Sequence, residues 1–194
     1  MSRRGFAGWM SMMFALAAAA VPVGAQTADG KIDYRVLATN KTSTMEKELN
    51  DGAEAGFRFQ AVMGGETAFG GNEVVVIMAK GGPRGRFAYK LLATSRTSTM
   101  QKELQQASDA GYQYRGQTVF ETLLGEEVVA ILERDNGAPA GGFEYRLVAT
   151  SKTATLQKEL LDVGAAGFEV LGMTVGKTAL GGAELVAIAR KVKR

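Results

Sequence analysis

The sequence predicts an α+β protein of three tandem β-α-β-β repeats, with a mostly antiparallel sheet and the helices packed on one face. The first observation is that the segment starting at Tyr34 returns at Tyr89 and at Tyr145, at offsets of 55 (89 − 34) and 56 (145 − 89) residues. The second is that each copy changes from a two-residue to a helical periodicity. The third is that each copy closes on a strand that is apolar at every position. A fixed period indicates one supersecondary unit used three times.

Each repeat opens with a predicted strand in which alternate residues are apolar or aromatic. These residues are Ile32, Tyr34 and Val36, then Phe87, Tyr89 and Leu91, then Phe143, Tyr145 and Leu147. The residues between them are polar, charged or small, and this alternation is typical of a half-buried strand.

A helix follows each of these strands. The segments Ser43–Glu46 and Ser98–Gln101 fit a capping box, and in the third copy, which has Ala154 at the Ser position, Thr153 or Thr155 is expected to cap. Apolar residues one turn apart, such as Met45, Leu49 and Ala53, predict one buried face. Each helix is expected to end at an Ala-Gly-aromatic sequence, where the glycine tolerates the left-handed conformation; the glycines are Gly56, Gly111 and Gly167.

The last strand of each repeat is predicted to be the central one. Val74–Met78, Val128–Leu132 and Leu185–Ala189 are apolar at every position, as expected of a strand covered on both faces. Lying antiparallel between the first two strands, it would leave those two parallel and joined by a right-handed crossover. A single unit is close to the lower limit for independent folding, so we expect the repeats to share a core. A continuous sheet and a pseudo-threefold arrangement both stay open.

The chain begins with a predicted secretory signal. Arg3 and Arg4 precede an apolar stretch over residues 6–21, and Val23-Gly24-Ala25 is typical of a signal cleavage site. The expected organisation is a signal peptide at 1–25 and repeats at 26–80, 81–134 and 135–194, with Gly/Pro linkers at 81–86 and 135–142 and a basic tail. A periplasmic or secreted location is expected, with no membrane span after cleavage.

The repeat resembles a known family. Each copy reads aromatic (Ile32 in the first copy)-x-Tyr-Arg/Lys-Leu/Val, then a helix ending in Leu, then Gly-aromatic, then an apolar strand closing on a basic residue; Phe143–Leu147 and Gly167–Val170 fit best. It resembles a short bacterial domain of unknown function whose single-copy members read E-Y-K-V, L-N, G-W-E and a final basic residue. The resemblance covers most of residues 32–191, with Phe or Tyr in place of the Trp. It implies the β-α-β-β fold and no particular activity.

Composition excludes several chemistries. The chain has no Cys and no His, which removes disulfides, structural zinc, most transition-metal sites and the Ser-His-Asp and Cys-His nucleophiles. Its 23 basic and 20 acidic residues become 21 and 20 once Arg3 and Arg4 leave with the leader, so nucleic acid is not an expected partner. No pair of carboxylates is brought together as hydrolysis of a glycoside needs. We expect a non-enzymatic protein without a cofactor or metal.

The strand-to-helix loops are one candidate site. Each combines a cation, hydroxyls and the free N–H groups of a helix start, which suit a small anion. The residues concerned are Lys41, Thr42, Arg96, Thr97, Lys152 and Thr153. Helix capping and solvation explain the same residues without a ligand. A small anionic-ligand binding protein is therefore the alternative function.

Protein contacts are the favoured function. Apolar residues at the tips of the predicted hairpins, Phe69, Leu124 and Leu180, suit a partner protein, although they could instead close the core over the neighbouring repeat. On the back face of the third repeat, Leu171, Met173 and Val175 predict self-association or docking, unless the tail or a linker covers them. The sequence thus favours a non-enzymatic protein-interaction or envelope-associated module.

Overall fold

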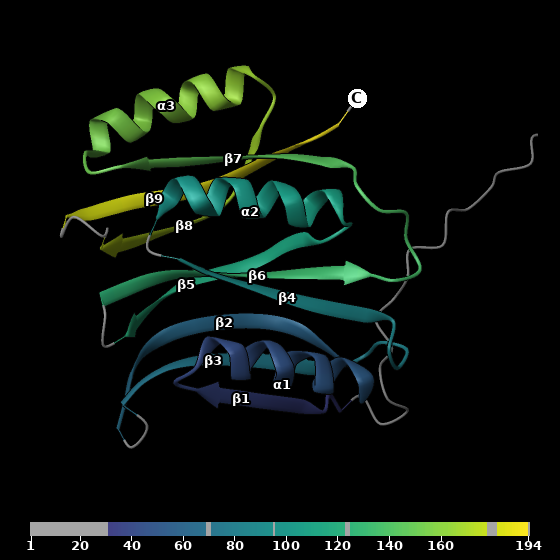
Figure 1. Cartoon of the computed structure of the whole chain (residues 1–194). Coiled ribbons are helices and arrows are strands. Elements are labelled where there is room, and N and C mark those ends of the chain that lie inside the picture. The colour runs from purple at the N-terminus through teal and green to yellow at the C-terminus, as the bar shows by residue number, and fades with distance from the viewer. Residues whose placement is uncertain (1–30, 69–70, 95, 123–124, 178–181, 194) are drawn as a thin grey trace, which may run out of the picture.

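The computed structural model describes residues 31–68, 71–94, 96–122, 125–177 and 182–193, which form nine strands and three helices (Figure 1). The first repeat comprises β1 (Tyr34–Thr39), α1 (Thr42–Glu54), β2 (Phe57–Thr67) and β3 (Gly71–Lys80). The second comprises β4 (Phe87–Thr94), α2 (Thr97–Asp109), β5 (Gln113–Thr122) and β6 (Gly125–Asp135). The third comprises β7 (Phe143–Thr150), α3 (Thr153–Ala165), β8 (Glu169–Lys177) and β9 (Ala183–Val192).

Each repeat forms its own three-stranded sheet. The strand orders are β1-β3-β2, β4-β6-β5 and β7-β9-β8, and both neighbours of each central strand are antiparallel to it. This confirms the predicted α+β class and the central place of the last strand in each repeat. The repeats share neither a continuous sheet nor a threefold arrangement, because the three sheets are separate layers of one stack (Figure 1).

Sheets and helices alternate along the stack. The core around α1 joins Met45, Leu49 and Met78 of the first repeat to Tyr89 and Ile131 of the second. The core around α2 joins the second repeat to the third in the same way, and a smaller core lies beneath α3. Each of the first two helices therefore lies between its own sheet and the next one. Figure 1 shows the first sheet at one end of the stack and α3 at the other.

A β-bulge recurs in the second strand of every repeat. The pairing shifts between Phe59 and Ala61, between Tyr114 and Gly116, and between Val170 and Gly172. The bulge corrects one prediction. Met173 and Val175 pair with Ala187 and Leu185 and thus lie on the face that carries α3, not on the back face, whereas Leu171 packs against the core of the second repeat. Counting alternate residues through a bulge reverses the faces beyond it.

The helix starts also differ from expectation. The N-cap residues are Lys41, Arg96 and Lys152, and none of these caps has a side-chain hydrogen bond, so the predicted capping boxes and the Thr153 or Thr155 cap are wrong. Glu46 and Gln101, which should have closed the boxes, contact the next repeat instead. The helix ends agree with prediction, because Gly56, Gly111 and Gly167 have φ of 84°, 90° and 80°.

Candidate functional site

Many of the side-chain hydrogen bonds among the described residues cross the junctions between repeats. In α1, Asn50 accepts a hydrogen bond from the Tyr89 N–H at 2.9 Å and donates one to the Tyr89 carbonyl at 3.0 Å. Glu46 accepts one from the Leu91 N–H at 2.8 Å. These bonds satisfy the outer edge of β4, which has no strand beyond it. The helix of one repeat therefore serves as the edge partner of the next sheet.

The second junction repeats this arrangement with glutamines. Gln105 accepts a hydrogen bond from the Tyr145 N–H at 3.0 Å, and Gln101 accepts one from the Leu147 N–H at 2.6 Å. Gln101 also donates to the Tyr145 carbonyl at 2.9 Å. One layer thus recognises the next by the same helix positions at both junctions.

A buried tyrosine reaches across each junction to the bulge of the preceding repeat. The Phe59 N–H donates to the Tyr89 hydroxyl at 2.8 Å, and the Tyr114 N–H donates to the Tyr145 hydroxyl at 2.9 Å. Both tyrosines are only 3% exposed. The bulge leaves a backbone donor outside the ladder, and the tyrosine oxygen satisfies it.

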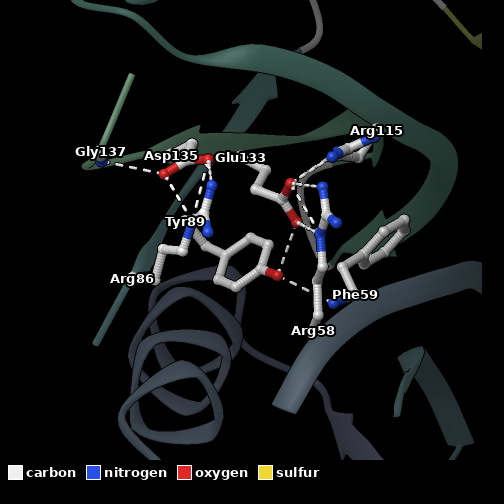
Figure 2. Close-up of polar contacts among 8 residues, drawn as sticks. All are labelled: Arg58, Phe59, Arg86, Tyr89, Arg115, Glu133, Asp135 and Gly137. Carbon is white, nitrogen blue, oxygen red and sulfur yellow. Dashed lines mark hydrogen bonds and ion pairs between the residues drawn. The ribbon is translucent and has the colours of Figure 1, made fainter. Parts of the chain in front are cut away.

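The first junction also contains a buried carboxylate. Glu133 of β6 is 4% exposed and lies between Arg58 of β2 and Arg115 of β5 (Figure 2). Arg58 donates from Nη2 to Oε1 at 2.8 Å, Arg115 donates from Nε to Oε1 at 3.0 Å and also through Nη2, and the Tyr89 hydroxyl donates to Oε2 at 2.8 Å. We call these four residues the Glu133 cluster. Through Arg58 it links β2 of the first repeat to the sheet of the second.

Electrostatics keeps this carboxylate ionised. Burial by itself would raise the pKa of Glu133, but the hydrogen bonds from Arg58 and Arg115 outweigh it and hold the pKa below its ordinary value. Burial, followed by the charge of Glu133, raises the pKa of Tyr89, and burial raises the pKa of Tyr114 to about 12. Both carboxylate oxygens already accept protein hydrogen bonds, so Glu133 is suited to joining layers and poorly suited to accepting a substrate proton.

Figure 2 also shows a second ion pair beside this cluster. Arg86, in the segment that enters β4, donates to Asp135 at 2.7 Å, and the Gly137 N–H donates to the same carboxylate at 2.9 Å. The hydrogen bond from Arg86 lowers the pKa of Asp135. This pair is more exposed than Glu133 and fixes the two connecting segments to each other.

The Glu133 cluster could not be predicted from the residues that the three repeats share. Ala79 and Arg190 occupy the place of Glu133 in the other two repeats, so the cluster exists at one junction only. At the second junction Arg190 instead stacks on the Phe143 ring, with 4.4 Å from Cζ to the ring centre. The usable signal was an acidic residue directly after the apolar run of the second copy, where the first copy has Ala79 and the third has Arg190.

The predicted anion-binding residues lie where the first strand of each repeat passes into the helix, so each of the three layers carries one pair. Lys41, Arg96 and Lys152 are exposed, and the N–H of each donates to the hydroxyl of a preceding threonine, respectively Thr39, Thr94 and Thr150. Thr42 and Thr97 are half-buried and Thr153 is exposed. The anion site stays a prediction.

Two shallow grooves lie beside these loops. One, of about 450 Å³, is lined by Thr97 and Ser98 together with Glu159 and Asp162. The other, of about 400 Å³, is lined by Thr42 and Ser43 together with Glu46 and Glu103. Each groove also contains one cation, Arg146 in the first and Lys90 in the second, so its two carboxylates leave a net negative charge, which disfavours an anion there.

The predicted hairpin tips Phe69, Leu124 and Leu180 lie outside the described residues. The hairpins that carry them start beside the strand-to-helix loops, since Thr39 pairs with Val74, Thr94 with Val128 and Thr150 with Leu185. Partner binding through the tips stays a prediction.

Large exposed apolar side chains gather at the two ends of the stack. One group lies on the back of the first sheet or leads into it, and we call it the N-terminal end face: Ile32, Tyr34, Val36, Met63 and Ile77. The other lies on α3 and the helix-bearing face of β8, and we call it the C-terminal end face: Leu161, Val170, Met173 and Val175. These are nine of the ten large exposed apolar residues among those described, and the tenth is Val192. Such clustering is typical of a contact surface.

Within the described ranges, no group of three or more Asp and Glu residues could hold a metal ion. None of the helices in those ranges is long and apolar enough to cross a membrane.

Comparison of the chain with protein-family models, curated proteins and solved structures gives no match.

Proposed function

We propose that this protein is a non-enzymatic, exported interaction module that binds protein through its two end faces. The observation that carries the proposal is the gathering of the exposed large apolar side chains on those two faces. Tyr34 illustrates the point. It is 58% exposed, whereas Tyr89 and Tyr145 at the same place in the later repeats are 3% exposed beneath the preceding layer. An apolar surface that is covered twice inside the chain and left open at its end favours a partner.

The polar chemistry supports a binding role over catalysis. Glu133, the carboxylate buried at the first junction, already accepts hydrogen bonds from two arginines and a tyrosine. Export is supported by the predicted signal peptide at residues 1–25.

Photo-crosslinking in the producing cells tests this proposal. A photoreactive amino acid is placed at Val36 on the N-terminal end face or at Met173 on the C-terminal one, with Val192 as the matched control because it is 67% exposed and lies on neither face. We expect discrete adducts with an identified polypeptide from the two end faces, and none from Val192. Absence of any adduct from both faces of the folded, exported protein would overturn the proposal.

A further inference from the structure

We infer that the partner of each end face is a second copy of this chain, so that the C-terminal end face of one copy packs on the N-terminal end face of the next. This inference rests on the proposed function, because it needs end faces that bind protein. It adds the identity of the partner and the register in which the two copies meet.

A head-to-tail contact would continue an interface that the chain already makes twice. The back of the second sheet is covered by α1 and β2, and the back of the third sheet by α2 and β5. The N-terminal end face is the same surface on the first sheet. The C-terminal end face, on α3 and β8, is the same surface as the one that does the covering. One chain therefore carries both halves of a contact whose geometry is set by its own junctions.

Side-chain sizes match across the junctions at the bulges. A Cβ on Gly116 would lie 3.1 Å from Cζ of Phe59, and one on Gly172 would lie 2.1 Å from the hydroxyl oxygen of Tyr114. A large ring thus faces a glycine at both internal junctions. At the ends of the stack the corresponding pair is Val170 and Ala61. The smaller valine leaves room for the methyl group of Ala61, so both residues change together as a packed contact requires.

The same matching recurs further along these strands. A Cβ on Gly176 would lie 3.8 Å from Cγ2 of Val119 and 3.0 Å from Cγ2 of Val128, so a valine of one layer faces a glycine of the next. The corresponding pair at the ends is Val175 and Gly65. A Cβ on Gly65 would meet no atom of its own chain within 4 Å, which leaves space for Val175 of a second copy.

The hydrogen-bonding groups of the two end faces also match those of the internal junctions. Gln157 of α3 occupies the place of Gln101, which accepts from the Leu147 N–H and donates to the Tyr145 carbonyl. In a head-to-tail contact Gln157 meets the Val36 N–H and the Tyr34 carbonyl of the next copy. The Tyr34 hydroxyl then meets the N–H of Val170 at the bulge, as Tyr89 meets Phe59.

One position departs from the internal junctions. Leu161 occupies the place of Asn50 and Gln105, which hydrogen-bond the first strand of the next repeat. The contact between copies therefore lacks these hydrogen bonds and has an apolar side chain in their place. We therefore expect an association weaker than the packing of repeats within a chain, and reversible. Because the two faces are different, the contact is heterologous, and copies add end to end instead of closing as a twofold dimer.

Sedimentation velocity with three variants of the exported protein tests the inference. Val36→Asp places a charge on the N-terminal end face, Met173→Asp places one on the C-terminal end face, and Val192→Asp is the control outside both. All three positions are more than half exposed, so the fold should persist, and thermal unfolding checks this. If Val36→Asp fails to fold, Met63→Asp takes its place.

We expect the average mass of the wild type and of Val192→Asp to rise with concentration. Each end-face variant alone should stay monomeric, with at least a tenfold weaker association. An equimolar mixture of the two should form a one-to-one dimer and stop there, since each variant keeps the face that the other has lost.

Three results would overturn the inference. An end-face variant that still dimerises alone would show a contact between like faces. A monomeric wild type whose end faces crosslink to a different polypeptide would leave the proposed function standing and remove this partner. A monomeric wild type without any crosslink would remove both.

Discussion

Replacing Glu133 by Gln tests the link between the first two layers. The substitution keeps the size of the side chain but removes its charge, which leaves Arg58 and Arg115 without their anion. Removing one member of a fully buried ion pair costs about 3–5 kcal/mol. The two arginines are 39% and 37% exposed and keep part of their hydration, so the loss in free energy of unfolding should be about 2 kcal/mol.

Urea unfolding followed by circular dichroism at pH 7 measures this loss. With a slope of about 2 kcal/mol/M, the midpoint should fall by about 1 M. Asp135→Asn is the control, because that carboxylate pairs with Arg86 nearer the surface and should change the midpoint far less. A Glu133→Gln midpoint within experimental error of the wild type would refute the role assigned to the cluster.

The difference in unfolding free energy between the wild type and Glu133→Gln should depend on pH. The pKa of Glu133 is lower in the folded than in the unfolded chain, so the unfolded chain binds the extra proton. The resulting stabilisation is fully present above the unfolded-state value of about 4.3 and is lost as pH falls through the folded-state pKa. The difference in stability between wild type and Glu133→Gln should therefore shrink on acidification. A difference that stays constant from pH 7 down to pH 3 would contradict this.

Three further predictions concern the other contacts. Tyr145→Phe removes the acceptor for the Tyr114 N–H and should cost about 1 kcal/mol of unfolding free energy, whereas an unchanged value would show that the bond contributes nothing. Gly64→Ala should destabilise the protein by about 1–3 kcal/mol, because its Cβ would lie 2.0 Å from the Val119 carbonyl oxygen. In α3, the Cβ of Gly164→Ala would meet no atom within 4 Å, so this substitution should stabilise the protein by about 1 kcal/mol. Equal effects of the two substitutions in thermal unfolding would contradict the packing described. Phosphate should not raise the melting temperature, given the carboxylates beside the loops; a rise that is lost when Lys41, Arg96 and Lys152 are all changed to Ala would instead support the anion site.

The strand order and the shared core could be predicted from the sequence because they depend on regular periodicity. Val74–Met78 is apolar on both faces, and this alone places β3 at the centre of its sheet. The bulge at Val170 could not be predicted in this way, since it inserts one residue into a strand without a distinctive composition. It moved Met173 and Val175 to the other face and so changed where the exposed apolar surface lies.

The candidate site was harder to predict because its contacts join residues far apart in the chain. Glu46 fits a local capping box, yet its carboxylate is used by Leu91 of the next repeat. Arg58 and Glu133 are 75 positions apart, and no local pattern relates them. The sequence predicted self-association through the third repeat. It did not predict the N-terminal end face around Tyr34, because that face is defined by the stacking of the layers.

The most direct test of head-to-tail stacking uses the absence of cysteine from the chain. Ala61→Cys and Met173→Cys are made in separate proteins. A Cβ on Gly116, which matches Ala61, would lie 3.0 Å from Cγ1 of Val62, which matches Met173, so the two thiols should come within disulfide range. We predict a disulfide-linked dimer when the two proteins are mixed under mild oxidation, and none when Val192→Cys replaces Met173→Cys. Equal crosslinking in both mixtures, or none in either, would contradict the stacking of copies.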